Sequence, residues 1–194
     1  IMIVAGTRPE AIKLSPVLNH LNNLEMETVF IWSGQHYDYE LSKVFFEQLK
    51  LPEPDVDLDI RSGTHAEQTA KLMFRLDKTI SYYKPSIVIA EGDTNTVLAT
   101  ALTSTKTQVP FAHVEAGLRS YDRAMPEEIN RTVADSLSEL LFAPTELAVV
   151  NLTHEGVPLR KIHCTGNTVV DVVVNHMDAI FKRGKELLDR MSLD

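Results

Sequence analysis

The chain has almost no cysteine and no long hydrophobic run. Its single cysteine, Cys164, excludes an internal disulfide framework and suits a reducing compartment, so we expect a cytoplasmic location. We expect Cys164 to be a small buried residue rather than a nucleophile. No apolar run approaches the roughly 18 residues that cross a bilayer, which predicts a protein without a membrane partner.

Positive charge and glycine-rich nucleotide fingerprints are also lacking. Lysine and arginine number 19 against 27 aspartates and glutamates, and the formal net charge of −8 argues against nucleic-acid binding. A local basic cluster for a small anion is still allowed. The loop after Val4 has neither G-x-G-x-x-G nor G-x-x-x-x-G-K-[ST], so neither NAD nor ATP is indicated. The 194 residues, 44% of them hydrophobic, suffice for one full core.

Short apolar strands alternate with amphipathic helices along the chain. Strands are predicted at Ile1–Val4, Thr28–Trp32, Ser86–Ala90, Val109–Val114, Leu140–Ala143 and Ile162–Cys164, with an extended piece at Val56–Ile60. Helices are predicted after Pro9, near Leu41–Leu49, and at His65–Tyr83, Asn95–Lys106, Glu127–Leu137, Glu146–Glu155 and Val169–Leu188. The stripe expected to face the core in the third helix is Ala66, Thr69, Met73, Leu76, Ile80 and Tyr83. This pattern indicates an α/β fold, a Rossmann-like parallel sheet with helices on both faces.

The first strand breaks into a tight loop and a helix start. Pro9 suits the first helical turn, and Thr7 can cap the amides beside it. Arg8 and Lys13 lie off the apolar stripe, near the helix end whose amides and dipole attract anions. We therefore expect a phosphate group here. The alternative is an ordinary turn with two solvated bases.

Charged residues gather where the predicted strands end. The nineteen residues His113–Arg131 carry four acids, three arginines and one histidine. Ligands of such sheets bind outside the carboxyl ends of the strands, which is where Asp93, His113 and Glu115 stand. The simpler alternatives are a helix cap for Asp93 and a hydrogen-bonded core position for His113. Glu115 has apolar neighbours and therefore needs a partner.

Glu127 and Arg131 stand four residues apart on one face of a helix that Pro126 starts. The spacing allows an exposed surface pair. Because so many other charged residues converge on the same edge of the sheet, we favour a place in a cleft.

Seven motifs resemble, in the same order, the amino-terminal half of the non-hydrolysing UDP-N-acetylglucosamine 2-epimerases. They are G-T-R-P-E-A-I-K (Gly6–Lys13), S-G-Q-H (Ser33–His36), E-G-D-T-N-T (Glu91–Thr96), H-V-E-A-G-L-R (His113–Arg119), P-E-E-I-N-R (Pro126–Arg131), A-P-T-E (Ala143–Glu146) and T-G-N-T-V-V-D (Thr165–Asp171). The resemblance implies the amino-terminal domain of a glycosyltransferase-B-type two-domain fold. Residues 1–168 would form this Rossmann-like domain, and residues 169–194 a helix that packs on it or leads to a carboxy-terminal domain.

The resemblance also implies an isomerase that interconverts UDP-GlcNAc and UDP-ManNAc by elimination and re-addition of UDP, without cofactor or metal. The family commonly forms homodimers. One alternative is a 2-epimerase for UDP-2,3-diacetamido-glucuronic acid, and another is an inactive sugar-nucleotide-binding half domain. Because the family continues into a second domain, we expect this chain alone to be inactive.

Roles for single residues follow from their positions in the matching motifs. Asp93, Glu115 and Glu127 resemble the family's catalytic carboxylates, and Lys13 and Arg131 its essential cations. The resemblance implies substrate-binding roles for Arg8, Lys13, His113 and Arg131, and activator-binding roles for Gln35 and His36.

Overall fold

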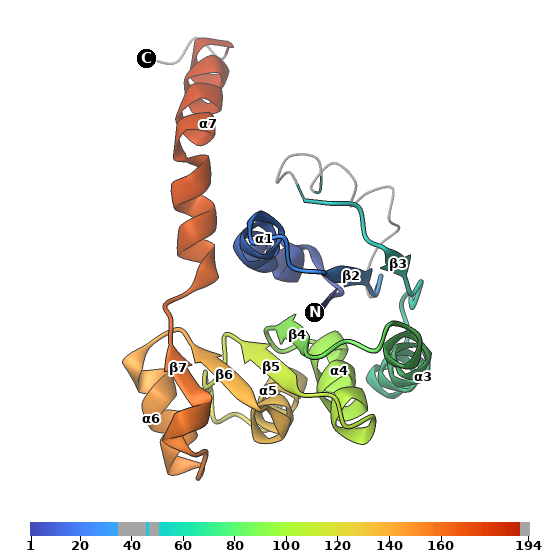
Figure 1. Ribbon diagram of the computed structural model, residues 1–194. Helices are drawn as coiled ribbons and strands as arrows, with labels where there is room; N and C mark the ends of the chain where they lie inside the picture. Colours follow the sequence, from blue (N-terminus) through green and yellow to red (C-terminus); the bar gives the residue numbers. More distant parts are fainter. Residues whose placement is uncertain (35–45, 47–50, 191–194) are drawn as a thin grey trace.

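A computed structural model describes residues 1–34, 46 and 51–190, which form a three-layer α/β fold (Figure 1). The described strands make one parallel sheet in the order β3-β2-β1-β4-β5-β6-β7. They are β1 (Met2–Ala5), β2 (Val29–Trp32), β3 (Val56–Asp57), β4 (Val88–Glu91), β5 (Phe111–Val114), β6 (Leu140–Ala143) and β7 (Ile162–Cys164). The helices are α1 (Arg8–Asn23), α3 (His65–Tyr83), α4 (Asn95–Lys106), α5 (Pro126–Leu137), α6 (Glu146–His154), the short 3-10 helix η1 (Leu159–Lys161) and α7 (Thr168–Arg190). The predicted parallel α/β sheet is confirmed.

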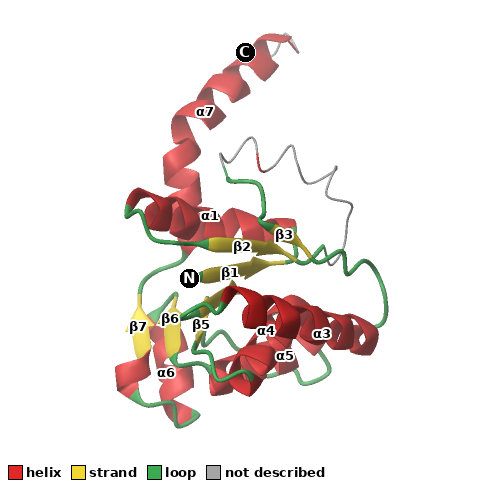
Figure 2. Ribbon diagram, turned by 45° about the vertical axis from the view of Figure 1, so that its right-hand side comes forward, coloured by secondary structure: helices red, strands yellow, loops and turns green. Residues whose placement is uncertain are grey.

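Helices cover both faces of the sheet, with α1 on one face and α3, α4, α5 and α6 on the other (Figures 1 and 2). Alternate residues of a strand point to opposite faces. In β1, Met2 and Val4 pack in the cluster with α3 and α4, whereas Ile3 and Ala5 pack with α1. Both sets must be apolar, which explains why the strands read as continuous apolar runs.

Element boundaries follow the sequence closely, and α3 and α4 have the predicted bounds. The predicted helix near Leu41–Leu49 lies outside the described residues apart from Phe46. The buried face of α3 consists of Gln68, Leu72, Leu76, Thr79 and Ile80. The predicted stripe was wrong at both ends, because Ala66 and Tyr83 are exposed. The buried face instead includes the polar residue Gln68, whose side-chain amide donates a hydrogen bond to the carbonyl of Arg61 at 3.1 Å.

The burial predicted for Cys164 is wrong, because this residue is exposed. Cys164 ends β7, which is the edge strand of the sheet. An edge strand has a neighbour on one side only, and His163 is exposed there as well. The apolar character of the segment therefore did not indicate a covered position.

The last helix, α7, contacts α1 and then extends away from the sheet (Figures 1 and 2). Val172 is buried, but the apolar residues Val169, Val170, Val173, Val174, Met177 and Phe181 are exposed. The division into residues 1–168 and 169–194 stays a prediction. Among the described helices, α7 included, none is both long and apolar enough to cross a membrane.

Candidate functional site

The direction of winding changes between β1 and β4, the strands at the middle of the sheet. From β1 the chain runs through α1 to β2 on one side, and from β4 it runs through α4 to β5 on the other. Ligands of open α/β sheets bind in the crevice at such a point. Three segments approach closely here: the loop after β1, the end of β2 and the start of α4. A Cβ atom on Gly6 would lie 2.1 Å from Oγ1 of Thr96 and 2.3 Å from Oγ of Ser33.

Glu10 joins the loop after β1 to the loop after β4 and accepts hydrogen bonds from two amides at the start of α1. It is buried, and its Oε2 accepts hydrogen bonds from the N–H groups of Gly6 and Thr7, each at 2.7 Å. Its Oε1 accepts from Oγ1 of Thr94 at 2.5 Å. Burial raises the pKa of Glu10, although these hydrogen bonds favour the carboxylate. Two of the amides expected to receive a phosphate are thus already paired, so this expectation depends on Arg8, the half-buried first residue of α1.

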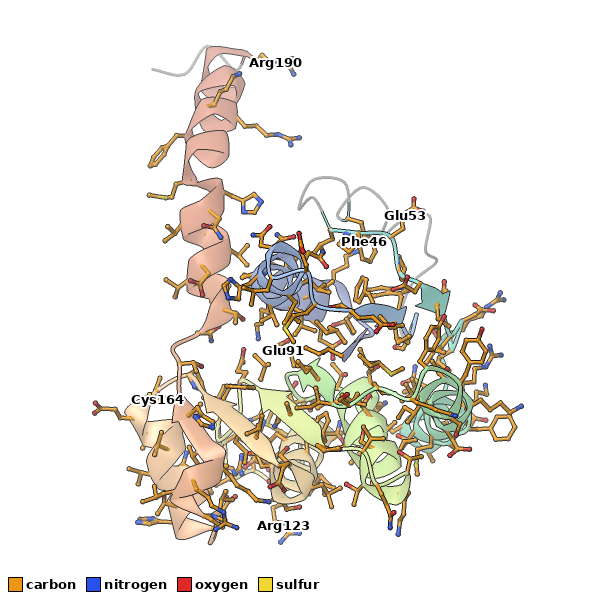
Figure 3. The ribbon with its side chains drawn as sticks, in the orientation of Figure 1. Phe46, Glu53, Glu91, Arg123, Cys164 and Arg190 are labelled. Carbon is orange, nitrogen blue, oxygen red and sulfur yellow. The ribbon has the colours of Figure 1, made fainter. Side chains whose placement is uncertain are left out.

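Lys13 of α1 lies between two carboxyl groups from neighbouring strands. Its Nζ is 2.9 Å from Oε1 of Glu91, the last residue of β4, and 2.5 Å from Oε2 of Glu115, which follows β5. The side chain of Glu91 is 1% exposed and that of Glu115 is 15% exposed. Figure 3 shows Glu91 between α1 and the sheet. The partner that Glu115 requires is therefore Lys13.

Burial and mutual contact give these three side chains different charge states. Burial raises the pKa of Glu91 to about 9, and its hydrogen bond with Glu115 acts in the same direction, against the attraction of Lys13. Partial burial opposes ionisation of Glu115, but hydrogen bonds from Glu91 and Lys13 hold its pKa below the usual range. Burial likewise opposes the charge of Lys13, yet its contacts with Glu115 and Glu91 raise its pKa. Neutral pH thus leaves an ammonium, one carboxylate and one carboxylic acid.

Glu115 also has an unusual backbone conformation. Its φ of 67° lies in the left-handed region, which costs an L-residue about 1–2 kcal/mol. The next two amides hold the turn, because Ala116 N–H donates to the carbonyl of Phe142 and Gly117 N–H to Oδ2 of Asp135, each at 3.1 Å. Strained positions that the surroundings maintain in this way cluster at functional sites.

Arg131 of α5 forms a second ion pair at the same edge of the sheet. Its Nη2 contacts Oδ2 of Asp93, and its Nη1 donates to Oε2 of Glu128 at 3.0 Å. The alternative in which Asp93 caps the next helix is wrong, because Thr94 is the N-cap of α4. The surface pair between Glu127 and Arg131 is not formed among the described residues, since Arg131 contacts Glu128 instead.

The adjacent residues Glu127 and Glu128 have different environments. Glu128 is buried, and its carboxylate accepts hydrogen bonds from the N–H groups of Ser120 and Tyr121, each at 3.0 Å. Glu127 is half-buried, and its side chain makes no hydrogen bond or ion pair within the described part of the chain. The carboxylate of Glu127 is therefore available to a ligand, whereas that of Glu128 holds the preceding loop.

His113 occupies a core position, which confirms the simpler alternative for this residue. It is fully buried, with Nδ1 2.6 Å from Oδ1 of Asp135 and Nε2 2.7 Å from the carbonyl oxygen of Gly92. Asp135 also accepts from Arg119 at 2.7 Å. Burial opposes the charge of His113, but Asp135 outweighs it and raises the pKa of the imidazole. The ring exposes no atom to a ligand; instead it holds Gly92, the residue before Asp93.

Four of the predicted catalytic residues meet in two ion pairs. Lys13 joins Glu115, and Arg131 joins Asp93. Lys13 also contacts Glu91, the last residue of β4, and Asp93 follows two residues later, so both pairs lie at one edge of the sheet. In the part of the chain that the structure describes, no group of three or more His, Cys, Asp or Glu side chains is arranged to hold a metal ion.

Three further residues complete the comparison with the sequence. Gln35 and His36 lie outside the described residues. Reasoning from the sequence missed Glu91. The signal was a carboxylate at the end of the apolar strand V-I-A-E, in a sheet expected to be covered on both faces.

Known proteins match most of this chain. The family profile described as UDP-N-acetylglucosamine 2-epimerase matches residues 19–192. The UDP-N-acetylglucosamine 2-epimerase of Methanocaldococcus jannaschii is 50% identical over 175 residues, which are 90% of this chain and 48% of that protein. The UDP-2,3-diacetamido-2,3-dideoxy-D-glucuronate 2-epimerase of Pseudomonas aeruginosa is 45% identical over 176 residues, which are 88% of this chain and 49% of that protein.

Solved structures agree with this match. A crystal structure of the M. jannaschii UDP-GlcNAc 2-epimerase in complex with UDP-GlcNAc and UDP superposes with a TM-score of 0.91. The sequence identity is 49%, over 93% of this chain and 50% of that chain. The predicted fold class is confirmed by this likeness, and the chain spans about half the length of the curated relatives it matches. The chain belongs to the UDP-N-acetylglucosamine 2-epimerase family.

Proposed function

We propose that this chain forms the amino-terminal half of an isomerase that interconverts UDP-GlcNAc and UDP-ManNAc. The observation that carries the proposal is the pair of cation–carboxylate contacts, Lys13 with Glu115 and Arg131 with Asp93, at the winding change of the sheet. Family membership supports the same reaction class. The complete protein would be a two-domain enzyme whose second domain closes the crevice.

The proposed chemistry requires both carboxylates and cations. No carbonyl group acidifies the proton at sugar C2, so direct exchange of that proton would be slow. Elimination avoids this difficulty: the C1–O bond to UDP breaks as C2 loses its proton, which leaves a 2-acetamidoglucal. Protonation of C2 from the opposite face and re-addition of UDP at C1 complete the inversion. Carboxylates serve as base and acid, and cations stabilise the departing diphosphate.

The structure suggests how the residues share this work. Glu127 has an unengaged carboxylate at the start of α5 and can reach a bound sugar without first breaking a contact. Lys13 and Arg131 contact Glu115 and Asp93. On binding, we propose that both cations also contact the diphosphate. Arg8 would support them from the positive end of the α1 dipole.

A second candidate substrate is UDP-2,3-diacetamido-glucuronic acid. The 45% identity to the P. aeruginosa enzyme is close to the 50% identity to the M. jannaschii enzyme and favours neither sugar strongly. The two substrates differ in an acetamido group at C3 and a carboxylate at C6. Parallel assays of the complete protein with both UDP-sugars, followed by NMR, distinguish these functions.

Three further features of the proposal rest on the sequence, the location on its single cysteine and the other two on the resemblance. They are a homodimeric complete protein, a cytoplasmic location, and an activator site that includes Gln35 and His36. Light scattering of the purified complete protein tests the first, and the effect of added UDP-GlcNAc on the reverse reaction tests the third.

Epimerisation in deuterium oxide is expected to place solvent deuterium at C2 of the product, because the proton that returns need not be the one removed. Proton NMR of UDP-ManNAc formed by the complete protein measures this label. The 194-residue chain is the matched control and should give no product, because a one-sided crevice positions the fragments poorly. Unlabelled product would contradict the elimination route. Turnover by the chain alone, at the rate of the complete protein, would contradict the proposal that this chain supplies only one side of the active-site crevice.

A further inference from the structure

We propose that Glu91 is a positioning residue that works as a neutral carboxylic acid, donating a hydrogen bond to Glu115 and accepting one from Lys13. No motif role was assigned to it from the sequence. Its importance for turnover rests on the proposed function, because Glu115 is taken there as an acid–base group. Its protonation state does not depend on that function.

The geometry of this cluster opposes ionisation of both carboxyl groups, Glu91 and Glu115. A single ammonium group, Nζ of Lys13, lies 2.9 Å from one carboxyl and 2.5 Å from the other. Both carboxyls are largely withdrawn from water, so two negative charges would face each other with little screening. When two carboxyl groups share one site, repulsion between the ionised forms strongly raises the pKa of one of them. One of the two therefore keeps its proton.

The proton belongs on Glu91 rather than on Glu115. Glu91 is the more deeply buried of the two, at 1% against 15% exposure, and burial disfavours the charged form. The charged groups that face it are Lys13 from α1 and Glu115 from the turn after β5. The flanking elements β1 and α4 contain no charged residue except Lys106, which is exposed at the far end of α4. The other neighbouring strand, β5, contains His113, whose ring nitrogens contact Asp135 and the carbonyl oxygen of Gly92. The pKa of Glu91, about 9, is consistent with this placement.

A neutral Glu91 affects both partners. The hydrogen bond that it donates fixes the carboxylate of Glu115 and helps to keep it ionised. Because Glu91 adds no negative charge, Lys13 is neutralised by one carboxylate and stays attractive to a diphosphate. An ionised Glu91 would compete with the diphosphate for the same ammonium group.

Two substitutions at this position separate a neutral role from an ionic one. Glu91→Gln keeps a donor for Glu115 and an acceptor for Lys13, so we expect kcat of the complete protein to stay within about threefold of wild type. Glu91→Leu has similar volume but neither group, and we expect kcat to fall by about tenfold or more. The alkaline decline of kcat/KM should shift to higher pH in Glu91→Gln. A Glu91→Gln enzyme as impaired as Glu91→Leu would overturn the proposal.

Infrared spectroscopy of the 194-residue chain tests the protonation state without any activity. The wild type minus Glu91→Gln difference spectrum at pH 7 should contain the C=O stretching band of a protonated carboxyl, and that band should vanish as the pH rises through about 9. A carboxylate band in its place at pH 7 would overturn the proposal. If the band is present but the complete protein does not epimerise UDP-GlcNAc, the proposed function fails and the assignment of the proton stands.

The pH dependence of stability provides a second readout that needs no substrate. A pKa raised on folding gives a stabilisation that is complete below the ordinary value and is lost as the pH rises through the folded value. Wild type should therefore lose stability relative to Glu91→Gln between about pH 4.5 and 9. Parallel thermal midpoints for the two proteins across this range would contradict a buried proton on Glu91.

Discussion

Single replacement of Asp93, Glu115 or Glu127 by the corresponding amide is expected to lower kcat of the complete protein by about a hundredfold or more, the scale of a lost acid–base group. An amide keeps the shape of the side chain but can neither take nor return the proton at C2. Chromatographic separation of UDP-GlcNAc and UDP-ManNAc measures the rates. A loss of less than about tenfold in any of the three would remove that residue from the acid–base set.

The neighbouring pair on α5 provides a matched control for this experiment. Glu127→Gln removes a carboxylate without a partner among the described residues, so its thermal midpoint should be close to that of wild type. Glu128→Gln replaces one of the two carboxylate oxygens that hold Ser120 and Tyr121 by an NH2 group, and it should lower the midpoint. Asp77→Asn, on the exposed face of α3, should change neither kcat nor the thermal midpoint. A Glu127→Gln protein that is simply unfolded would show that Glu127 has a structural role instead.

Asp135→Asn is expected to destabilise the chain by about 3–5 kcal/mol, the usual cost of breaking a buried ion pair. Asp135 lies between His113 and Arg119, and all three side chains are at most 1% exposed. An amide leaves the guanidinium with only its contact to the partly exposed Glu155 and removes the negative charge that stabilises the imidazolium. Urea unfolding of the 194-residue chain, followed by circular dichroism, measures the change. Glu139→Gln, which breaks an exposed pair with Lys161, should leave the free energy of unfolding nearly unchanged.

The pH dependence of this destabilisation has a defined sign. Burial opposes ionisation of Asp135, but His113 and Arg119 outweigh it and lower its pKa, so its stabilisation is lost as the pH falls through that lowered value. The pKa of His113 is raised, so its contribution is complete below its ordinary value and is lost at higher pH. The free energies of unfolding of wild type and Asp135→Asn should therefore differ most between about pH 4 and 6.5. A difference below about 1 kcal/mol in this window would contradict a charged cluster.

The fold could be predicted from the sequence because its signals are local. An apolar run followed directly by a segment of helical periodicity identifies β4 and then α4. The bounds of α3 and α4 can likewise be recognised without knowledge of the rest of the chain. The burial of single residues was harder. Gln68 is buried because Arg61 and Asn95 satisfy its amide, and these partners lie in the segment before α3 and on α4.

The site was predictable in its residue types but not in its pairing. The requirement that Glu115 has a partner follows from its apolar neighbours, yet nothing local indicates that the partner is Lys13, 102 residues away. The same limit applies to Arg131, which stands four residues from Glu127 and contacts Asp93 and Glu128 instead. Helical spacing shows which contacts are possible, and the tertiary arrangement selects among them.

The central position of β1 has a consequence for the order of events during synthesis. Lys13 leaves the ribosome early, but its partners follow 78 and 102 residues later. Until β4 and β5 have emerged and paired, its ammonium group has no counter-charge and β1 has an unpaired edge. Contacts between residues so far apart form slowly, because a long loop must close first. The polar centre of this crevice is therefore assembled late, and its appearance in a nascent chain would mark completion of the middle of the sheet.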